Sequence, residues 1–232
     1  MNESYIETYV DFNGNVSHRK LIGIIRIKTF AALKFFFDRF LALWGLLLAS
    51  PLMIIISIAI KIDSKGPVFF RQKRTGKNSK EFYICKFRTM VEKNDVHDFS
   101  KSDEHTRVGK ILRKTSLDEI PQLFSILTGK MSFIGPRPWI PDYYDNMNSI
   151  QKHRYDVRPG LTGLAQVMGR NNLTIFDKIR YDLKYIEDYS LIQDIKIVFL
   201  TIKTVFIGSG ADAGKNTIKT ELEDLKIFNN KK

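Results

Sequence analysis

The chain has 232 residues, which is enough for one ordinary domain with extensions and short for two. Hydrophobic residues make up 44% and charged residues 27%, which excludes a disordered chain and a protein built only of spanning helices. The single cysteine excludes an intramolecular disulfide framework. A formal net charge of +12 calls for an anionic partner, and nucleic acid, an anionic lipid surface and an anionic substrate all fit it.

Residues 1–34 are predicted to be a basic, amphipathic N-terminal extension. The first twenty contain acidic side chains and no long apolar run, so we do not expect a signal peptide, and we expect the globular part on the cytosolic side. Residues 21–39 mix apolar and charged side chains, which fits a helix at a membrane surface and an amphipathic core helix equally.

Residues 40–60, FLALWGLLLASPLMIIISIAI, carry no charged side chain. With a rise of about 1.5 Å per residue, a helix of this length can cross a hydrocarbon core of about 30 Å. We therefore predict a membrane helix here.

Two features argue against a simple span. Ser50-Pro51 stands in the middle of the run, and proline removes a helix hydrogen bond. Both flanks are rich in lysine and arginine, which places both ends on the cytosolic side. We predict a re-entrant helix broken at Ser50-Pro51, with a proline-kinked span as the alternative. We also expect the Ser50 hydroxyl to bond a carbonyl that Pro51 leaves free.

The rest of the chain predicts a short β-hairpin followed by helices. The strands are expected over residues 68–73 and 81–88, around a turn at 75–79. After Asp194, residues 195–207 have only two charges, Lys196 and Lys203, seven positions apart, which is typical of an interfacial amphipathic helix or of a core helix with a narrow wet edge. The other helices are predicted over residues 106–113, 117–127, 149–154 and 176–189, with a polar loop over 92–104, a glycine-rich loop over 159–169 and a polar, loosely attached tail over 208–232.

Two adjacent carboxylates, Asp118 and Glu119, lie in the stretch KTSLDEIPQ. Ser116 and Glu119 have capping-box spacing, so one interpretation is an ordinary helix start with acidic residues in its first turn. The other is that the two carboxylates hold Mg²⁺ and meet a phosphate.

Three basic residues are candidates for phosphate binding. Arg137 lies between two rigid prolines in Gly135-Pro136-Arg137-Pro138, and its guanidinium suits a phosphate. Lys86 and Arg88 share one face of the second predicted strand. The alternatives are a solvated turn arginine and the exposed face of a hairpin.

The order of these motifs resembles the bacterial sugar transferase family, the monotopic polyprenyl-phosphate phosphoglycosyl transferases. The resemblance covers about residues 35–207 and rests on a Ser-Pro-interrupted apolar helix followed by KFRTM, LDEIPQL, GPRP and VRPGLTGLAQVMGR. Met168 departs from the pattern, since asparagine usually precedes the last Gly-Arg, and this puts polar contacts in the nucleotide or sugar pocket in doubt.

The resemblance implies a mainly α fold with a short β-hairpin (α+β), a re-entrant membrane helix and interfacial helices, with residues 35–207 as the transferase domain. It implies that Asp118 is the nucleophile, that Glu119 shares Mg²⁺ with it, and that Arg137 contacts phosphate. Lys86, Arg113, Asp182 and Asp194 match further positions associated with activity, and we expect them to bind substrate or phosphate. For the two aspartates the sequence alone also allows a solvated helix face and an N-cap.

The implied reaction moves a sugar 1-phosphate from a UDP-sugar to undecaprenyl phosphate, releases UMP and passes through an aspartyl phospho-sugar. It would initiate a surface polysaccharide or glycan at the cytoplasmic membrane, facing the cytoplasm, with membrane lipids as partners and without nucleic acid; a homo-oligomer is left open. Two other classes are considered: a membrane-anchored basic binding module without catalysis, and a hydrolase using the carboxylate pair as acid and base.

Overall fold

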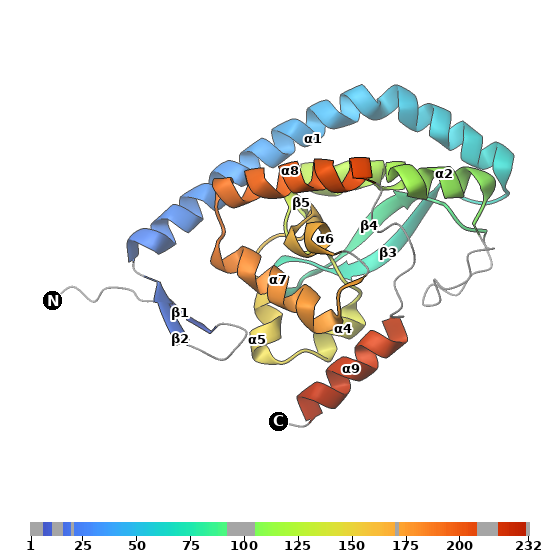
Figure 1. Ribbon diagram of the computed structural model, residues 1–232. Helices are drawn as coiled ribbons and strands as arrows, with labels where there is room; N and C mark the ends of the chain where they lie inside the picture. Colours follow the sequence, from blue (N-terminus) through green and yellow to red (C-terminus); the bar gives the residue numbers. More distant parts are fainter. Residues whose placement is uncertain are drawn as a thin grey trace.

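The computed structural model describes residues 7–10, 16–19, 21–91, 105–169, 172–207 and 218–230. Helices dominate, and the strands pair only two by two (Figure 1). The elements are β1 (Glu7–Val10), β2 (Val16–Arg19), α1 (Leu21–Asp63), β3 (Phe69–Thr75), η1 (Lys77–Ser79), β4 (Glu81–Phe87), α2 (Arg107–Thr115), η3 (Leu117–Gln122), α3 (Leu123–Leu127), β5 (Ser132–Ile134), α4 (Pro141–Asp145), α5 (Ser149–Lys152), η4 (His153–Tyr155), β6 (Gly160–Thr162), α6 (Leu164–Met168), α7 (Ile175–Glu187), α8 (Leu191–Ile207) and α9 (Ile218–Asn230). The predicted loop over 92–104 and the tail residues 208–217 lie outside the described part.

The apolar segment is one continuous helix. The predicted break at Ser50-Pro51 is absent, because α1 stays helical through Pro51 and arches instead of stopping (Figure 1). Pro51 has no N–H for the carbonyl of Leu47, four residues earlier, and the Ser50 hydroxyl donates to that oxygen at 2.8 Å. The predicted role of the Ser50 hydroxyl is therefore confirmed.

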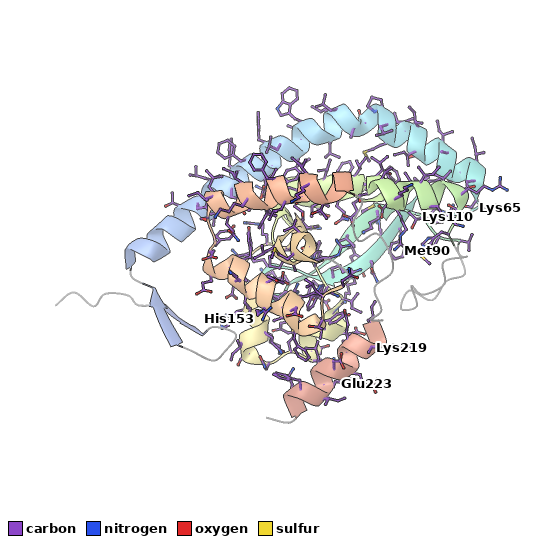
Figure 2. The ribbon with its side chains drawn as sticks, in the orientation of Figure 1. Lys65, Met90, Lys110, His153, Lys219 and Glu223 are labelled. Carbon is purple, nitrogen blue, oxygen red and sulfur yellow. The ribbon has the colours of Figure 1, made fainter. Side chains whose placement is uncertain are left out.

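Most of α1 lies on the surface. The part Thr29–Asp63 is long and apolar enough to cross a membrane, and only 17% of its most apolar stretch of 18 residues is buried. Figure 2 shows large side chains projecting from the outer side of the arch. A core helix of a water-soluble protein would bury this face, so α1 is not an ordinary core helix.

The predicted hairpin is confirmed as β3 and β4, paired antiparallel with Thr75 opposite Glu81. Its turn contains η1, with Asn78 and Ser79 at positive φ angles of 53° and 61°. The hairpin packs on α3, where Phe82, Ile84 and Ile126 are buried together with Ala42 of α1.

The predicted helix over 106–113 is confirmed as α2, capped by the Thr106 hydroxyl, which accepts from the Gly109 amide at 2.9 Å. Gly109 lies against the Thr89 backbone so closely that a Cβ atom would stand 2.0 Å from its carbonyl oxygen. The predicted helix over 117–127 divides into the 3₁₀ turn η3 and the short α3, because Pro121 lies inside it.

The chain after α3 contains elements that the sequence did not predict. Strand β5 pairs in parallel with β6, which lies in the predicted glycine-rich loop, and α6 follows within the same loop. The predicted helix over 149–154 appears as α5 followed by η4, and that over 176–189 as α7. Helix α8 buries Asp194 and Ile197 and leaves most of its apolar residues exposed, so the core-helix interpretation of 194–207 does not hold.

The C-terminal residues are not a loosely attached tail. Helix α9 packs on α7 and α4, with Leu225 fully buried and with Ile218 and Leu222 against the same core cluster. The spacing of these three residues places them on one face of a helix, a signal that the polar composition of the segment hid.

The predicted boundary between residues 34 and 35 falls inside α1. It also separates Lys34 from the body to which it is bound, since Lys34 pairs with Asp194 of α8. The extension and the predicted domain are therefore joined at this point.

Candidate active site

The carboxylate pair lies in the first turn of η3, directly after α2. Ser116 joins the two helices in the left-handed region, with φ at 57°. The predicted capping box is not formed, because the Ser116 side chain makes no cap hydrogen bond. The Glu119 side chain instead points to two cations from other parts of the chain.

The first cation is Lys86 of β4, which packs directly on η3. Its Nζ atom lies 2.5 Å from Glu119 Oε1 and 3.9 Å from Asp118 Oδ2. The three side chains are mostly buried, with exposed fractions between 13% and 19%. One ammonium group therefore lies within reach of both carboxylates.

The second cation is Arg137, in the loop between β5 and α4. Its Nη2 atom lies 3.2 Å from Glu119 Oε1, and its side chain is half exposed. Gly135 allows this loop to pass close to the chain before β6, because a Cβ there would lie 2.4 Å from the Arg158 carbonyl oxygen. The guanidinium is thus anchored at Glu119 while part of it still faces solvent.

The two carboxyl groups have different acidities. Burial by itself raises the pKa of Glu119, but the nearby Arg137 and Lys86 outweigh it and lower this pKa to about 2. Burial raises the pKa of Asp118, and the charge of Glu119 adds to that effect, while Lys86 opposes it. Glu119 is therefore the permanently charged member, and Asp118 is the more basic of the two.

Lys86 depends on the carboxylates for its charge. Burial lowers the pKa of its ammonium group, and the charge of Glu119 is the main influence in the opposite direction. Lys86, Glu119 and Asp118 are consequently a coupled cluster, in which removal of one charge changes the other two.

One cation of the site, Arg74, was not predicted from the sequence. Arg74 of β3 donates through Nη1 to the carbonyl oxygen of Pro138, next to Arg137, at 3.3 Å. Burial, together with the charge of Arg137, lowers its pKa to about 10. The sequence signal was weak, since Arg74 is one of several basic residues around the hairpin turn.

Arg113, at the end of α2, lies at the edge of this cluster. Its exposed guanidinium contacts His105 Nε2 at 3.0 Å, and its charge lowers the pKa of Asp118. The predicted residues Lys86, Arg113, Asp118, Glu119 and Arg137 thus come together in one place.

Three other predicted residues lie elsewhere and make structural contacts. Arg88 is buried and donates to the carbonyl and hydroxyl oxygens of Ser64, beyond the end of α1, so it does not share the surroundings of Lys86. Asp182 forms a buried ion pair with Arg154, and Asp194 forms one with Lys34. The solvated-face alternative for Asp182 does not hold because this side chain is buried. The N-cap alternative for Asp194 does not hold because α8 already begins at Leu191.

The carboxylate pair fits a magnesium ion in part. Mg²⁺ in phosphate-transferring sites is held by one or two carboxylates together with substrate phosphates and water. Among the described residues the Asp118 carboxylate accepts no hydrogen bond, and Lys86 is its only ion-pair partner within 4 Å. No cluster of three or more His, Cys, Asp or Glu side chains occurs in the same described ranges, so a metal here would need substrate oxygens as further ligands.

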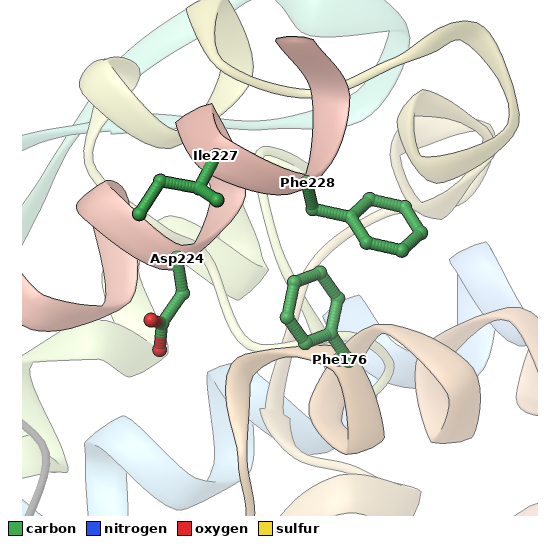
Figure 3. Close-up of a pocket in the computed structure, with 4 residues that line it drawn as sticks. All are labelled: Phe176, Asp224, Ile227 and Phe228. Carbon is green, nitrogen blue, oxygen red and sulfur yellow. The ribbon is translucent and has the colours of Figure 1, made fainter. Parts of the chain in front are cut away.

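A pocket lies between α7 and α9, away from the carboxylate cluster (Figure 3). It is lined by Phe176, Asp224, Ile227 and Phe228, and the rings of Phe176 and Phe228 are 4.9 Å apart. It contains none of the predicted site residues, and its one carboxylate has no basic residue among the lining side chains.

Comparison with known proteins gives consistent matches. The family described as "Bacterial sugar transferase" matches residues 29–208. A galactosyl transferase, CpsE, of Streptococcus agalactiae is 42% identical over 194 residues, covering 77% of this chain and 43% of that protein. An undecaprenyl-phosphate N-acetylgalactosaminephosphotransferase of Aeromonas hydrophila is 41% identical over 205 residues, covering 84% of this chain and 48% of that protein. The uncharacterized sugar transferase EpsL of Bacillus subtilis is 37% identical over 180 residues, covering 77% of this chain and 89% of that protein. The chain therefore spans less than half the length of the first two relatives.

Proposed function

Because this chain belongs to the bacterial sugar transferase family, we propose that it transfers a sugar 1-phosphate from a UDP-sugar to undecaprenyl phosphate and releases UMP. The observation that carries the proposal is the carboxylate pair in a cluster of cations, with Lys86 bonded to Glu119 and Arg137 beside it. Relatives named for this reaction with N-acetylgalactosamine and glucose donors support the substrate class.

The reaction proceeds as a double displacement at phosphorus. An Asp118 oxygen forms a bond to the sugar-bearing phosphorus of the donor, and the bond from this phosphorus to the UMP oxygen breaks. A phosphate oxygen of the lipid carrier then attacks the same phosphorus and displaces Asp118. The products are UMP and a polyprenyl diphospho-sugar, and the Asp118 carboxylate is restored.

Asp118 suits the nucleophile because burial raises its pKa, which makes its carboxylate more basic than an ordinary one. Lys86 keeps this carboxylate charged and oriented at 3.9 Å. Glu119 fixes Lys86 and Arg137 through one oxygen, Oε1, which leaves the exposed part of Arg137 for the donor's phosphate oxygens.

Magnesium, bound by Asp118 and Glu119 with donor phosphate oxygens, would neutralise charge that builds up during phosphoryl transfer. Arg137 and Lys86 supply the same kind of stabilisation from the protein itself. Lys86 Nζ lies closer to Glu119 Oε1, at 2.5 Å, than to Asp118 Oδ2, at 3.9 Å.

The acceptor explains the exposed apolar surface. The outer face of α1 and the exposed residues of α8 suit the lipid phase of the cytoplasmic membrane, and the arch of α1 is compatible with a re-entrant helix whose two basic ends face the cytoplasm (Figure 1). Each basic residue close to an anionic leaflet contributes about 1 kcal/mol to membrane attachment. Both substrates are also anionic, which accounts for the net charge of +12.

The decisive experiment measures UMP release from a panel of UDP-sugars by the purified protein with Mg²⁺ and undecaprenyl phosphate. Asp118→Asn is expected to abolish release, whereas Glu81→Gln, which changes an exposed carboxylate of the hairpin, should leave it intact. Omission of the lipid should leave one phospho-sugar bound per protein, seen as added mass on the intact chain. UMP release by Asp118→Asn at the normal rate would refute the mechanism, and lipid-independent turnover with water as acceptor would indicate a hydrolase.

A further inference from the structure

In the loop that carries Arg137, nearly every main-chain carbonyl accepts a hydrogen bond. The Pro136 carbonyl accepts from the Gly160 amide and the Trp139 carbonyl from the Thr75 amide, each at 2.9 Å. These bonds come from backbone groups of neighbouring strands. Side chains bond three further carbonyls: Arg154 bonds that of Arg137, Arg74 that of Pro138, and both Ser132 and Tyr185 lie within hydrogen-bond distance of that of Ile134. Of these side chains, Arg154 and Tyr185 are each bound to an aspartate.

The first of these side chains is Arg154, which is almost completely buried. Its Nη2 atom donates to the Arg137 carbonyl oxygen at 2.7 Å and, like its Nε atom, to Asp182 Oδ2, at 2.7 and 3.0 Å. Its guanidinium also stacks 3.7 Å above the ring of Trp139. Asp182 of α7 therefore fixes Arg154, and Arg154 fixes the peptide group of Arg137.

The second is Tyr185, also on α7. Its hydroxyl lies 3.1 Å from the Ile134 carbonyl oxygen and 2.8 Å from Asp194 Oδ1. Lys34 of α1 bonds the other oxygen of Asp194 at 2.6 Å. A connected set of contacts thus runs from α1 through α8 and α7 to the start of the loop.

We propose that Asp182 and Asp194 are positioning residues for Arg137, acting through Arg154 and Tyr185 on the two ends of the segment 134–137. The proposal rests on the proposed function, in which Arg137 contacts the transferred phosphate. It gives these two aspartates an indirect role in place of the substrate contact that the sequence suggested. They lie outside the carboxylate cluster, yet a single side chain stands between each of them and the loop.

The physical reason is the geometry of the arginine. The side chain of Arg137 reaches Glu119 from a backbone whose neighbours on both sides are prolines, so its direction follows the orientation of its own peptide groups. A small rotation at the Arg137 carbonyl is multiplied along the length of the side chain. Misplacement of a catalytic group by about 1 Å can cost about a hundredfold in rate.

A purely structural role for the two ion pairs is the alternative, because breaking any buried pair destabilises a protein. The two roles differ in their dependence on Arg137. If Asp182 and Tyr185 act through Arg137, their loss should matter little once Arg137 has been removed, which makes the effects strongly non-additive.

The test compares Asp182→Asn and Tyr185→Phe, each with Arg137 present and in an Arg137→Ala background. With Arg137 present, each is expected to lower kcat for UMP release about tenfold, and in the Arg137→Ala background less than about twofold. Tyr143→Phe is the matched control, since its buried hydroxyl bonds Glu221 of α9 and no atom of the segment 134–137.

A second measurement needs no turnover. Hydrogen exchange of peptides that cover residues 134–139 should accelerate in Asp182→Asn and Tyr185→Phe and stay unchanged in Tyr143→Phe. Unchanged exchange in the two test variants would overturn the inference whether or not the enzyme turns over. Equal kinetic losses in both backgrounds would overturn it as well. Failure of the unaltered protein to turn over any UDP-sugar, with exchange accelerated as expected, would refute the proposed function and leave the fastening of the loop supported.

Discussion

Replacement of Lys86 by methionine tests the electrostatic argument for the nucleophile. In the proposed mechanism Asp118 attacks as a carboxylate, so activity falls as the pH drops through its pKa. Burial raises this pKa and the ammonium group of Lys86 opposes the rise. Loss of Lys86 must therefore raise the pKa of Asp118 further and move the acid limb of the pH profile towards neutral pH.

The magnitude follows from the distance of 3.9 Å between Lys86 Nζ and Asp118 Oδ2. Two unit charges about 4 Å apart attract each other by about 1 kcal/mol in bulk water and about 4 kcal/mol at an effective dielectric constant of about 20. One pKa unit corresponds to about 1.4 kcal/mol, so the acid limb should move by about 1 to 3 units. Both side chains keep some solvent contact, which favours the lower part of this interval.

The assay is kcat/KM for UMP release as a function of pH, at saturating undecaprenyl phosphate. Lys73→Met is the matched control, because Lys73 is an exposed lysine of the same hairpin paired with Glu81, and it should leave the acid limb where it is. An acid limb that stays in place in Lys86→Met, with only the rate reduced, would refute the reasoning, since the limb would then belong to another group.

Three further predictions concern stability. The pKa of Glu119 is lowered from 4.5 to about 2 in the folded protein, so the stabilisation that it contributes is complete above pH 4.5 and is lost as the pH falls to about 2. Glu119→Gln should flatten this part of the pH dependence of the unfolding free energy, and an unchanged slope would contradict the lowered pKa. Gly109→Ala should lower the melting temperature and displace α2, because its Cβ would stand 2.0 Å from the Thr89 carbonyl oxygen, whereas Gly45→Ala, with 3.4 Å to its nearest neighbour, should melt like the unaltered protein. Leu225→Ala should lower the free energy of unfolding by about 2 to 5 kcal/mol, measured with denaturant, because this side chain of α9 is fully buried against α7 and α4. A loss below about 0.5 kcal/mol would show that α9 does not pack on these helices in solution.

Much of the local structure could be read from the sequence. The hairpin followed from two β-rich runs around a turn, and α1 from an uncharged apolar run. Even the bond from the Ser50 hydroxyl to the Leu47 carbonyl followed from the missing N–H of Pro51. These features depend on residues close together in the chain, where the choice of backbone conformation is local. The break at Pro51 was wrong because a helix with a satisfied carbonyl can bend at proline without ending.

The residues of the site could be named from motif order, but their arrangement could not. Lys86 and Glu119 are 33 positions apart, and only the packing of β4 on η3 brings them into contact. Arg88, two positions after Lys86, was expected on the same face, yet it lies beyond the end of β4 and bonds Ser64 instead. Alternation along a strand predicts a face only as far as the strand continues.

The pairing partners of the buried aspartates were decided by the tertiary structure alone. Asp182 pairs with Arg154, 28 positions away in the sequence, and Asp194 pairs with Lys34, 160 positions away. A buried aspartate must be paired, but the sequence does not specify its partner, because many lysines and arginines of this basic chain would satisfy the charge. The fold selects each pair by packing α7 on η4, which carries Arg154, and by bringing Asp194 of α8 to Lys34 of α1. The sequence by itself thus determined the chemical groups and the local elements that carry them, and long-range packing decided which groups meet.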